Sequence, residues 1–174
     1  MHLLVIRLSA MGDVAMSIPV LRLLLDTYPE MKITVVSRGF LKPLFADLPR
    51  TQFVEADVYG KHKGIPGLRR LAKEIKPLKI DAVADLHQVL RSKILSFFFK
   101  IAGVPVAKID KGRKEKKALT RANGAEIHPL KTTHQRYADV FADLGFPIDL
   151  KQHTYPQTPT LTQDLKDIFK PGKK

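Results

Sequence analysis

Residues 1–28 read MHLLVIRLSAMGDVAMSIPVLRLLLDTY, and this stretch decides the fold. It predicts a buried strand over Leu3–Arg7, a short loop, and a helix over Val14–Tyr28 that is apolar nearly all round. A helix of that kind needs cover on most of its sides. The stretch therefore predicts the opening strand and helix of a layered domain.

The same alternation of strands and helices continues to about residue 150. Further strands are predicted over Lys32–Ser37, Gln52–Ala56, Ile80–Leu86 and Val104–Ile109. Helices are predicted near Leu41–Asp47 and over Gly67–Ile75, Val89–Ile101 and Thr133–Leu144. This order is typical of an α/β domain, so we predict a Rossmann-like, doubly wound and mainly parallel sheet over residues 1–150. Residues 151–174 are rich in Pro, Thr and Gln and are predicted to be a linker or tail.

The charge of the chain indicates a polyanionic partner. Its 174 residues carry 30 Lys and Arg against 17 Asp and Glu, a formal charge of +13. Such an excess suits nucleic acid, an anionic membrane or a phosphorylated substrate. The basic residues concentrate in Lys61–Lys79 and Lys108–Arg121, which hold almost no aromatic side chains for stacking against bases. We expect these two stretches to be loops at the strand ends that grip phosphates, with a merely solvated surface as the plainer interpretation.

Two other features bear on compartment and cofactor. The chain has no cysteine, and its opening apolar run is short and not preceded by a basic segment, so we predict a cytoplasmic protein without a signal peptide. The six histidines are scattered, with no spacing typical of metal ligands. We therefore expect neither a bound metal nor another cofactor.

The loop Leu8–Asp13 carries the best candidate for chemistry. In doubly wound sheets, ligands bind at the carboxyl ends of the strands, where this loop is predicted to lie. It has a single glycine and matches neither the GxGxxG nor the GxxxxGK[ST] pattern, which argues against nicotinamide enzymes and common nucleotide kinases. Its carboxylate, Asp13, has two possible roles. It could cap the following helix, or it could accept a proton from a substrate hydroxyl.

Three segments resemble the family 9 glycosyltransferases, the ADP-heptose:lipopolysaccharide heptosyltransferases. They are Arg7–Val14 with Pro19 behind it, Asp85–Ser92 after the predicted fourth strand, and His134–Tyr137 followed by Leu144-Gly145. They occur in the family's order and cover most of the chain. At His87-Gln88 the sequence departs from the more usual Gln-Gly, which puts acceptor contacts at these two positions in doubt.

The resemblance implies an enzyme whose two Rossmann-like domains divide the work. The present chain would be the N-terminal, acceptor-binding domain, and an absent C-terminal domain would hold the donor, ADP-heptose or a similar nucleotide-sugar. Asp13 maps onto the family's catalytic base. The acceptor, a phosphorylated lipopolysaccharide core, would be met at the cytoplasmic face of the inner membrane by Ser9, Met11, Gly12, His87, Gln88 and Arg91. Transfer would be inverting and independent of metal, and the isolated chain would be inactive.

A different class of function stays open at this stage. The chain could be a stand-alone basic α/β module that binds nucleic acid or another polyanion, with Asp13 serving only as a helix cap. The absence of a recognised nucleic-acid motif favours the transferase.

Overall fold

The computed structural model describes residues 1–121 and 129–152. Its centre is one sheet of five parallel strands in the order β3-β2-β1-β4-β5. The strands are β1 (His2–Ile6), β2 (Lys32–Ser37), β3 (Thr51–Glu55), β4 (Ala82–Asp85) and β5 (Val106–Lys108). The predicted Rossmann-like, doubly wound architecture is confirmed.

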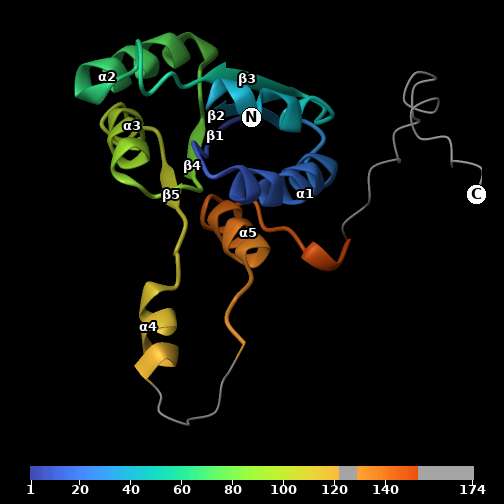
Figure 1. Cartoon of the computed structure of the whole chain (residues 1–174). Helices are drawn as coiled ribbons and strands as arrows, with labels where there is room; N and C mark the ends of the chain where they lie inside the picture. Colours follow the sequence, from blue (N-terminus) through green and yellow to red (C-terminus); the bar gives the residue numbers. More distant parts are fainter. Residues whose placement is uncertain (122–128, 153–174) are drawn as a thin grey trace, which may run out of the picture.

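Helices cover both faces of the sheet (Figure 1). One face carries α1 (Met11–Thr27), the 3-10 helix η1 (Gly39–Phe45) and α5 (Thr133–Asp143). The other face carries α2 (Gly64–Ile75) and α3 (Leu90–Lys100). The remaining helices are α4 (Arg113–Arg121), which follows β5 and stands away from the sheet in Figure 1, η2 (Lys76–Leu78) and η3 (Leu150–Gln152).

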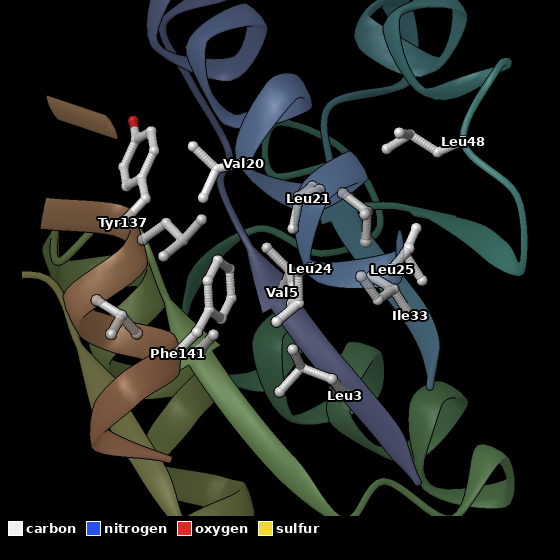
Figure 2. Packing of buried hydrophobic residues seen from close by; sticks show 14 of the residues in the cluster. Leu3, Val5, Val20, Leu21, Leu24, Leu25, Ile33, Leu48, Tyr137 and Phe141 are labelled. Atoms are coloured by element: carbon white, nitrogen blue, oxygen red, sulfur yellow. The ribbon is translucent and has the colours of Figure 1, made fainter. Parts of the chain in front are cut away.

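Alternate side chains of β1 build two cores, one on each face of the sheet. Leu3 and Val5 pack with α1 and with Phe141 of α5 (Figure 2). Leu4 and Ile6 pack on the opposite face with apolar residues of α2 and α3. A strand buried on both sides reads as a continuous apolar run, which is why the sequence marked β1 so clearly. The central position of β1 fixes the loop that follows it.

The first helix begins earlier than the sequence predicted. It starts at Met11 rather than Val14, its N-cap residue is Ala10, and Asp13 is its third residue. The interpretation of Asp13 as the helix cap is therefore wrong. A carboxylate in the first turn still interacts favourably with the positive end of the helix dipole.

We expected the two basic stretches, Lys61–Lys79 and Lys108–Arg121, to be loops at the carboxyl ends of the strands, and this prediction is wrong. Most of Lys108–Arg121 forms α4, a helix that the sequence analysis did not predict. The first stretch, Lys61–Lys79, contains α2, which runs back from the carboxyl end of β3 to η2 and the start of β4. Its lysines are therefore spread along α2, and Lys76 and Lys79 lie near the amino ends of the strands, away from the carboxyl ends.

Two further predictions concern the C-terminal tail and the absence of a membrane-spanning segment. Of the predicted tail, residues 153–174 lie outside the described residues. In the part that is described, no helix is both long and apolar enough to cross a bilayer.

Candidate active site

The candidate residues meet at the switch point of the sheet. From β1 the chain proceeds outward through β2 to β3, and from β4 it proceeds the other way to β5. The loops after β1 and β4 therefore leave in opposite directions. The place between them, at the carboxyl ends of the strands, is where doubly wound sheets bind ligands, and we call it the crevice. Across this crevice, Ser9 Oγ lies 3.3 Å from His87 Nε2. Two segments about 80 residues apart in sequence are thus brought together.

Asp13 lies at this crevice, held by a buried arginine. Its carboxylate pairs with the guanidinium of Arg7, whose side chain is 6% exposed while that of Asp13 is 43% exposed. Arg7 also donates to the backbone carbonyl of Leu86, in the loop after β4. The Arg7 guanidinium is therefore fixed between the two loops. It holds the Asp13 carboxylate in position while that carboxylate stays accessible.

Tyr137 of α5 contacts the first turn of α1, which carries Asp13. Its hydroxyl donates to the backbone carbonyl of Asp13 at 3.0 Å, and its ring centroid lies 5.9 Å from the Arg7 guanidinium carbon. Burial raises the pKa of the Tyr137 hydroxyl, so it stays protonated and keeps its role as donor. In Figure 2 the Tyr137 oxygen points out of the apolar cluster that holds its ring.

His87 is a buried, neutral imidazole. Burial, followed by the charges of Arg7 and Lys111, lowers its pKa to about 4. Burial and the neighbouring Arg7 likewise lower the pKa of Lys111. The Nδ1 atom of His87 has no hydrogen-bond partner within the described residues. The site thus places two cations, Arg7 and Lys111, beside a neutral imidazole at one crevice, and Arg7 is already paired with Asp13. Lys111 adds positive charge that suits a substrate carrying negative charge.

The loop that bears His87 and Gln88 is shaped by Asp85. This buried carboxylate accepts from the backbone N–H groups of His87 and Gln88 at 2.9 and 2.8 Å. Its other oxygen accepts from the Ser92 hydroxyl at 3.0 Å. Gln88 adopts a left-handed backbone conformation, with φ of 47°. The two ends of the segment Asp85–Ser92 therefore hold the loop's conformation, and the loop carries His87 to within 3.3 Å of Ser9.

Arg91 lies farther along, in a group of cations and aromatic rings. Its guanidinium carbon is 5.4 Å from the Tyr59 ring centroid, and that of Arg38 is 5.1 Å from the same ring. Arg38 also lies 4.8 Å from the Phe40 ring centroid. These four residues follow β2, β3 and β4, so they form a rim at the carboxyl edge of the sheet. We call Arg38, Phe40, Tyr59 and Arg91 the cation–aromatic rim.

Met11 and Gly12 form the exposed start of α1. The Met11 side chain is 57% exposed. A Cβ atom added to Gly12 would meet no atom within 4 Å, so packing does not require glycine there. The open space beside Gly12 is consistent with close approach of a substrate to the turn.

Sequence reasoning missed Arg7, Tyr137, Lys111 and the aromatic part of the rim. Arg7 had a visible signal, because a charged residue at the end of a buried strand requires a counter-charge. The expected absence of metal remains an expectation. Among residues 1–121 and 129–152, no three His or acidic side chains are grouped as metal ligands.

Several known proteins with similar sequence or fold are sugar transferases. The lipopolysaccharide core heptosyltransferase OpsX of Haemophilus influenzae is 29% identical over 98 residues, which is 56% of this chain and 27% of OpsX. The structure of a family 9 glycosyltransferase from Veillonella parvula matches with a TM-score of 0.62 at 23% identity, over 83% of this chain and 42% of that enzyme. The resemblance to the family 9 glycosyltransferases is confirmed. No protein-family model matches the sequence.

A second solved structure extends the likeness to family 9. Heptosyltransferase WaaC of E. coli, solved with ADP-2-deoxy-2-fluoro heptose, matches with a TM-score of 0.60 at 19% identity. The match covers 91% of this chain and 51% of WaaC. The chain thus spans about half the length, or less, of the relatives that it matches. At these identities the two structures establish a shared fold.

Proposed function

We propose that this chain is the acceptor-side domain of an inverting family 9 glycosyltransferase. The enzyme transfers heptose, or a related sugar, from ADP-heptose or a similar nucleotide-sugar to a phosphorylated lipopolysaccharide core. The observation that carries the proposal is the accessible Asp13 carboxylate at the switch point, fixed by Arg7 and Tyr137. The similarity to OpsX, a lipopolysaccharide core heptosyltransferase, supports the substrate class.

Asp13 acts as the general base in this proposal. Its carboxylate accepts the proton of the acceptor hydroxyl as that oxygen forms a bond to the anomeric carbon. The bond from the anomeric carbon to the diphosphate breaks on the opposite face, and the nucleoside diphosphate leaves with the electron pair. The transition state resembles an oxocarbenium ion, and base catalysis of this kind contributes about 10²–10⁴-fold.

The acceptor occupies the crevice and its rim. The reacting hydroxyl is surrounded by five residues of the two loops, Ser9, Met11, Gly12, His87 and Gln88. Arg91 binds a phosphate of the core. Arg38 and Tyr59 beside Arg91 offer a second cation and an aromatic face for a sugar ring. The donor is held by a second domain outside these 174 residues, at the cytoplasmic face of the inner membrane, and no metal takes part.

Replacing the base tests the proposal. In the complete enzyme, Asp13→Asn should lower kcat by at least about 10²-fold, because the amide cannot accept the proton. The substitution also leaves the buried Arg7 guanidinium without its counter-charge, so the free energy of unfolding should fall, and kcat is compared on protein that circular dichroism shows to be folded. Asp47→Asn, on an exposed turn, is the matched control and should retain full activity. Near-normal turnover by Asp13→Asn would remove Asp13 as the base and the proposal with it.

One observation favours a second candidate function, a binding module for nucleic acid. The rings of Phe40 and Tyr59 are 55% and 65% exposed and lie against guanidinium groups. Nucleic-acid bases stack on such surfaces. The final prediction of the Discussion separates the two functions.

A further inference from the structure

Helix α3 carries an apolar stripe on its solvent side. Leu90, Ile94, Phe97 and Ile101 recur at the spacing of one helix face, from the first residue of α3 to the residue that caps its end. Leu90, Phe97 and Ile101 are 74%, 56% and 65% exposed. The core-facing side of α3 is separate, since Leu95 and Phe99 are buried. Solvent-facing stripes of helices are normally polar, so this one indicates an interaction surface.

A groove with cationic walls lies beside the stripe, between α2 and α3. It has a volume of about 500 Å³, and Phe98, Phe99 and Val104 contribute to its apolar lining. Its four charged lining residues are all cations, namely Arg69, Lys73, Lys76 and Lys79. Within the described chain, no acidic side chain lines this groove.

Neutralising acids on these two helices are scarce. The sequence of α3 contains no acidic residue, and that of α2 contains only Glu74. Glu74 is engaged with His62 Nε2 at 3.2 Å and Lys61 Nζ at 3.4 Å. The α2–α3 layer therefore joins an apolar stripe to a net positive field.

We propose that the α2–α3 layer docks the protein on an anionic phospholipid bilayer. The exposed stripe enters the boundary between headgroups and acyl chains, and the cations of α2 and η2 meet the lipid phosphates. A bilayer supplies an anionic layer directly above an apolar one, which is the combination that this surface matches. The aliphatic stems of the lysines can lie along apolar surface while the ammonium groups reach the phosphates.

The orientation of α3 connects this surface to the candidate active site. Leu90 follows directly on the loop that carries His87 and Gln88, so the stripe runs from the crevice toward the opposite edge of the sheet. A bilayer along α3 therefore has the Asp13 crevice beside it, within reach of a lipid-linked acceptor. This last step rests on the proposed function, whereas the docking itself does not.

Vesicle binding tests the proposal without any sugar substrate. The chain should bind vesicles of mixed phosphatidylcholine and phosphatidylglycerol and ignore vesicles of phosphatidylcholine alone. Binding should weaken as salt is added, because exposed charges are screened. The double substitution Lys73→Gln and Lys76→Gln should lower the partition coefficient at least about tenfold, since each lysine near the surface contributes about 1 kcal/mol. Phe97→Gln with Ile101→Gln should lower it by a similar factor.

Matched controls lie on the α1–η1 side of the molecule or at its edge. Phe40 is as exposed as Phe97, so Phe40→Gln is the control for Phe97→Gln. Lys32→Gln with Lys42→Gln removes the same charge as Lys73→Gln with Lys76→Gln. The controls should bind vesicles nearly as the wild type does. Equal losses in the control and test variants would show a general charge effect and overturn the proposal.

Two further outcomes complete the test. If the Phe97 and Ile101 pair leaves vesicle binding unchanged but converts a dimer to a monomer in sedimentation, the stripe belongs to a second copy and the proposal fails. Asp13→Asn should bind vesicles as the wild type does. Failure of the docking surface and failure of the transferase proposal are therefore read from separate measurements.

Discussion

His87 is a residue whose folded environment changes its chemistry. Burial, with Arg7 and Lys111 nearby, lowers its pKa to about 4. In the unfolded chain, an ordinary imidazole titrates near a pKa of about 6.5. Between these values the unfolded state binds a proton that the folded state rejects. The free energy of unfolding should therefore fall as pH drops from about 6.5 to about 4, and this contribution is fully present only above that window.

The substitution His87→Gln should remove this part of the pH dependence. Glutamine is neutral at every pH, so the variant should lose less stability than the wild type between about pH 7 and about pH 4.5. Urea unfolding at the two pH values gives both free energies. Parallel losses in the two proteins would show that His87 does not titrate as its surroundings imply.

Asp13 could be chosen from the sequence, but its pairing with Arg7 could not. A carboxylate between a strand and a helix, in a segment similar to a family pattern, was enough to single out Asp13. Its ion pair with Arg7 depends on the helix beginning at Met11, because only then does the first turn bring the third helical residue back to the strand end. Residue type alone does not locate a helix start to that accuracy.

Among the elements, the loop after β4 depends most on a single side chain. Asp85 accepts three hydrogen bonds from within its own loop and from α3. Asp85→Ala should lower the free energy of unfolding by at least about 3 kcal/mol, since each buried donor left unpaired costs about 1–3 kcal/mol. Ser92→Ala, which removes only one of these partners, should cost about 1 kcal/mol. Urea unfolding compares the two, and an equal cost would contradict the central role given to Asp85.

The strands were easier to predict than the helices. The central strands β1, β2 and β4 are buried and read as mostly apolar runs, whereas the edge strands β3 and β5 were found from shorter and less buried segments. All five strands were found. Helix α2 begins at Gly64, before the predicted Gly67, because Pro66 is tolerated in a first turn. Helix α4 was missed because its charge dominated the interpretation, although Lys, Glu, Ala and Leu favour helix. Charge along a chain and helix propensity are separate properties.

At the scale of the molecule, the positive charge divides into regions that sequence position does not reveal. One lies in the α2–α3 groove, a second at the cation–aromatic rim and a third on α4. The alternation of elements predicted the doubly wound sheet, because such a sheet requires a helix between parallel strands. It could not predict which cations share a surface, since α2 runs from one edge of the sheet to the other.

The rim and the groove should therefore respond to different partners. Arg91→Gln and Tyr59→Ala should each weaken binding of a phosphorylated core oligosaccharide by about tenfold, because a charge-assisted hydrogen bond contributes about 1.5–3 kcal/mol and an aromatic contact somewhat less. Both variants should bind anionic vesicles as the wild type does. Arg69→Gln, in the groove, should show the opposite pattern.

Nucleic acid is the decisive competitor in that measurement, since the rim could also stack bases. A protein of charge +13 attracts any polyanion at low salt, so titrations of the oligosaccharide and of single- and double-stranded DNA must be compared at physiological ionic strength. If the rim binds the sugar acceptor, DNA binding should collapse with salt while oligosaccharide binding persists, because the core is recognised by specific contacts as well as by charge. Tight, Tyr59-dependent binding of single-stranded DNA, with the oligosaccharide ignored, would instead assign the rim to nucleic acid and favour the binding module over the transferase.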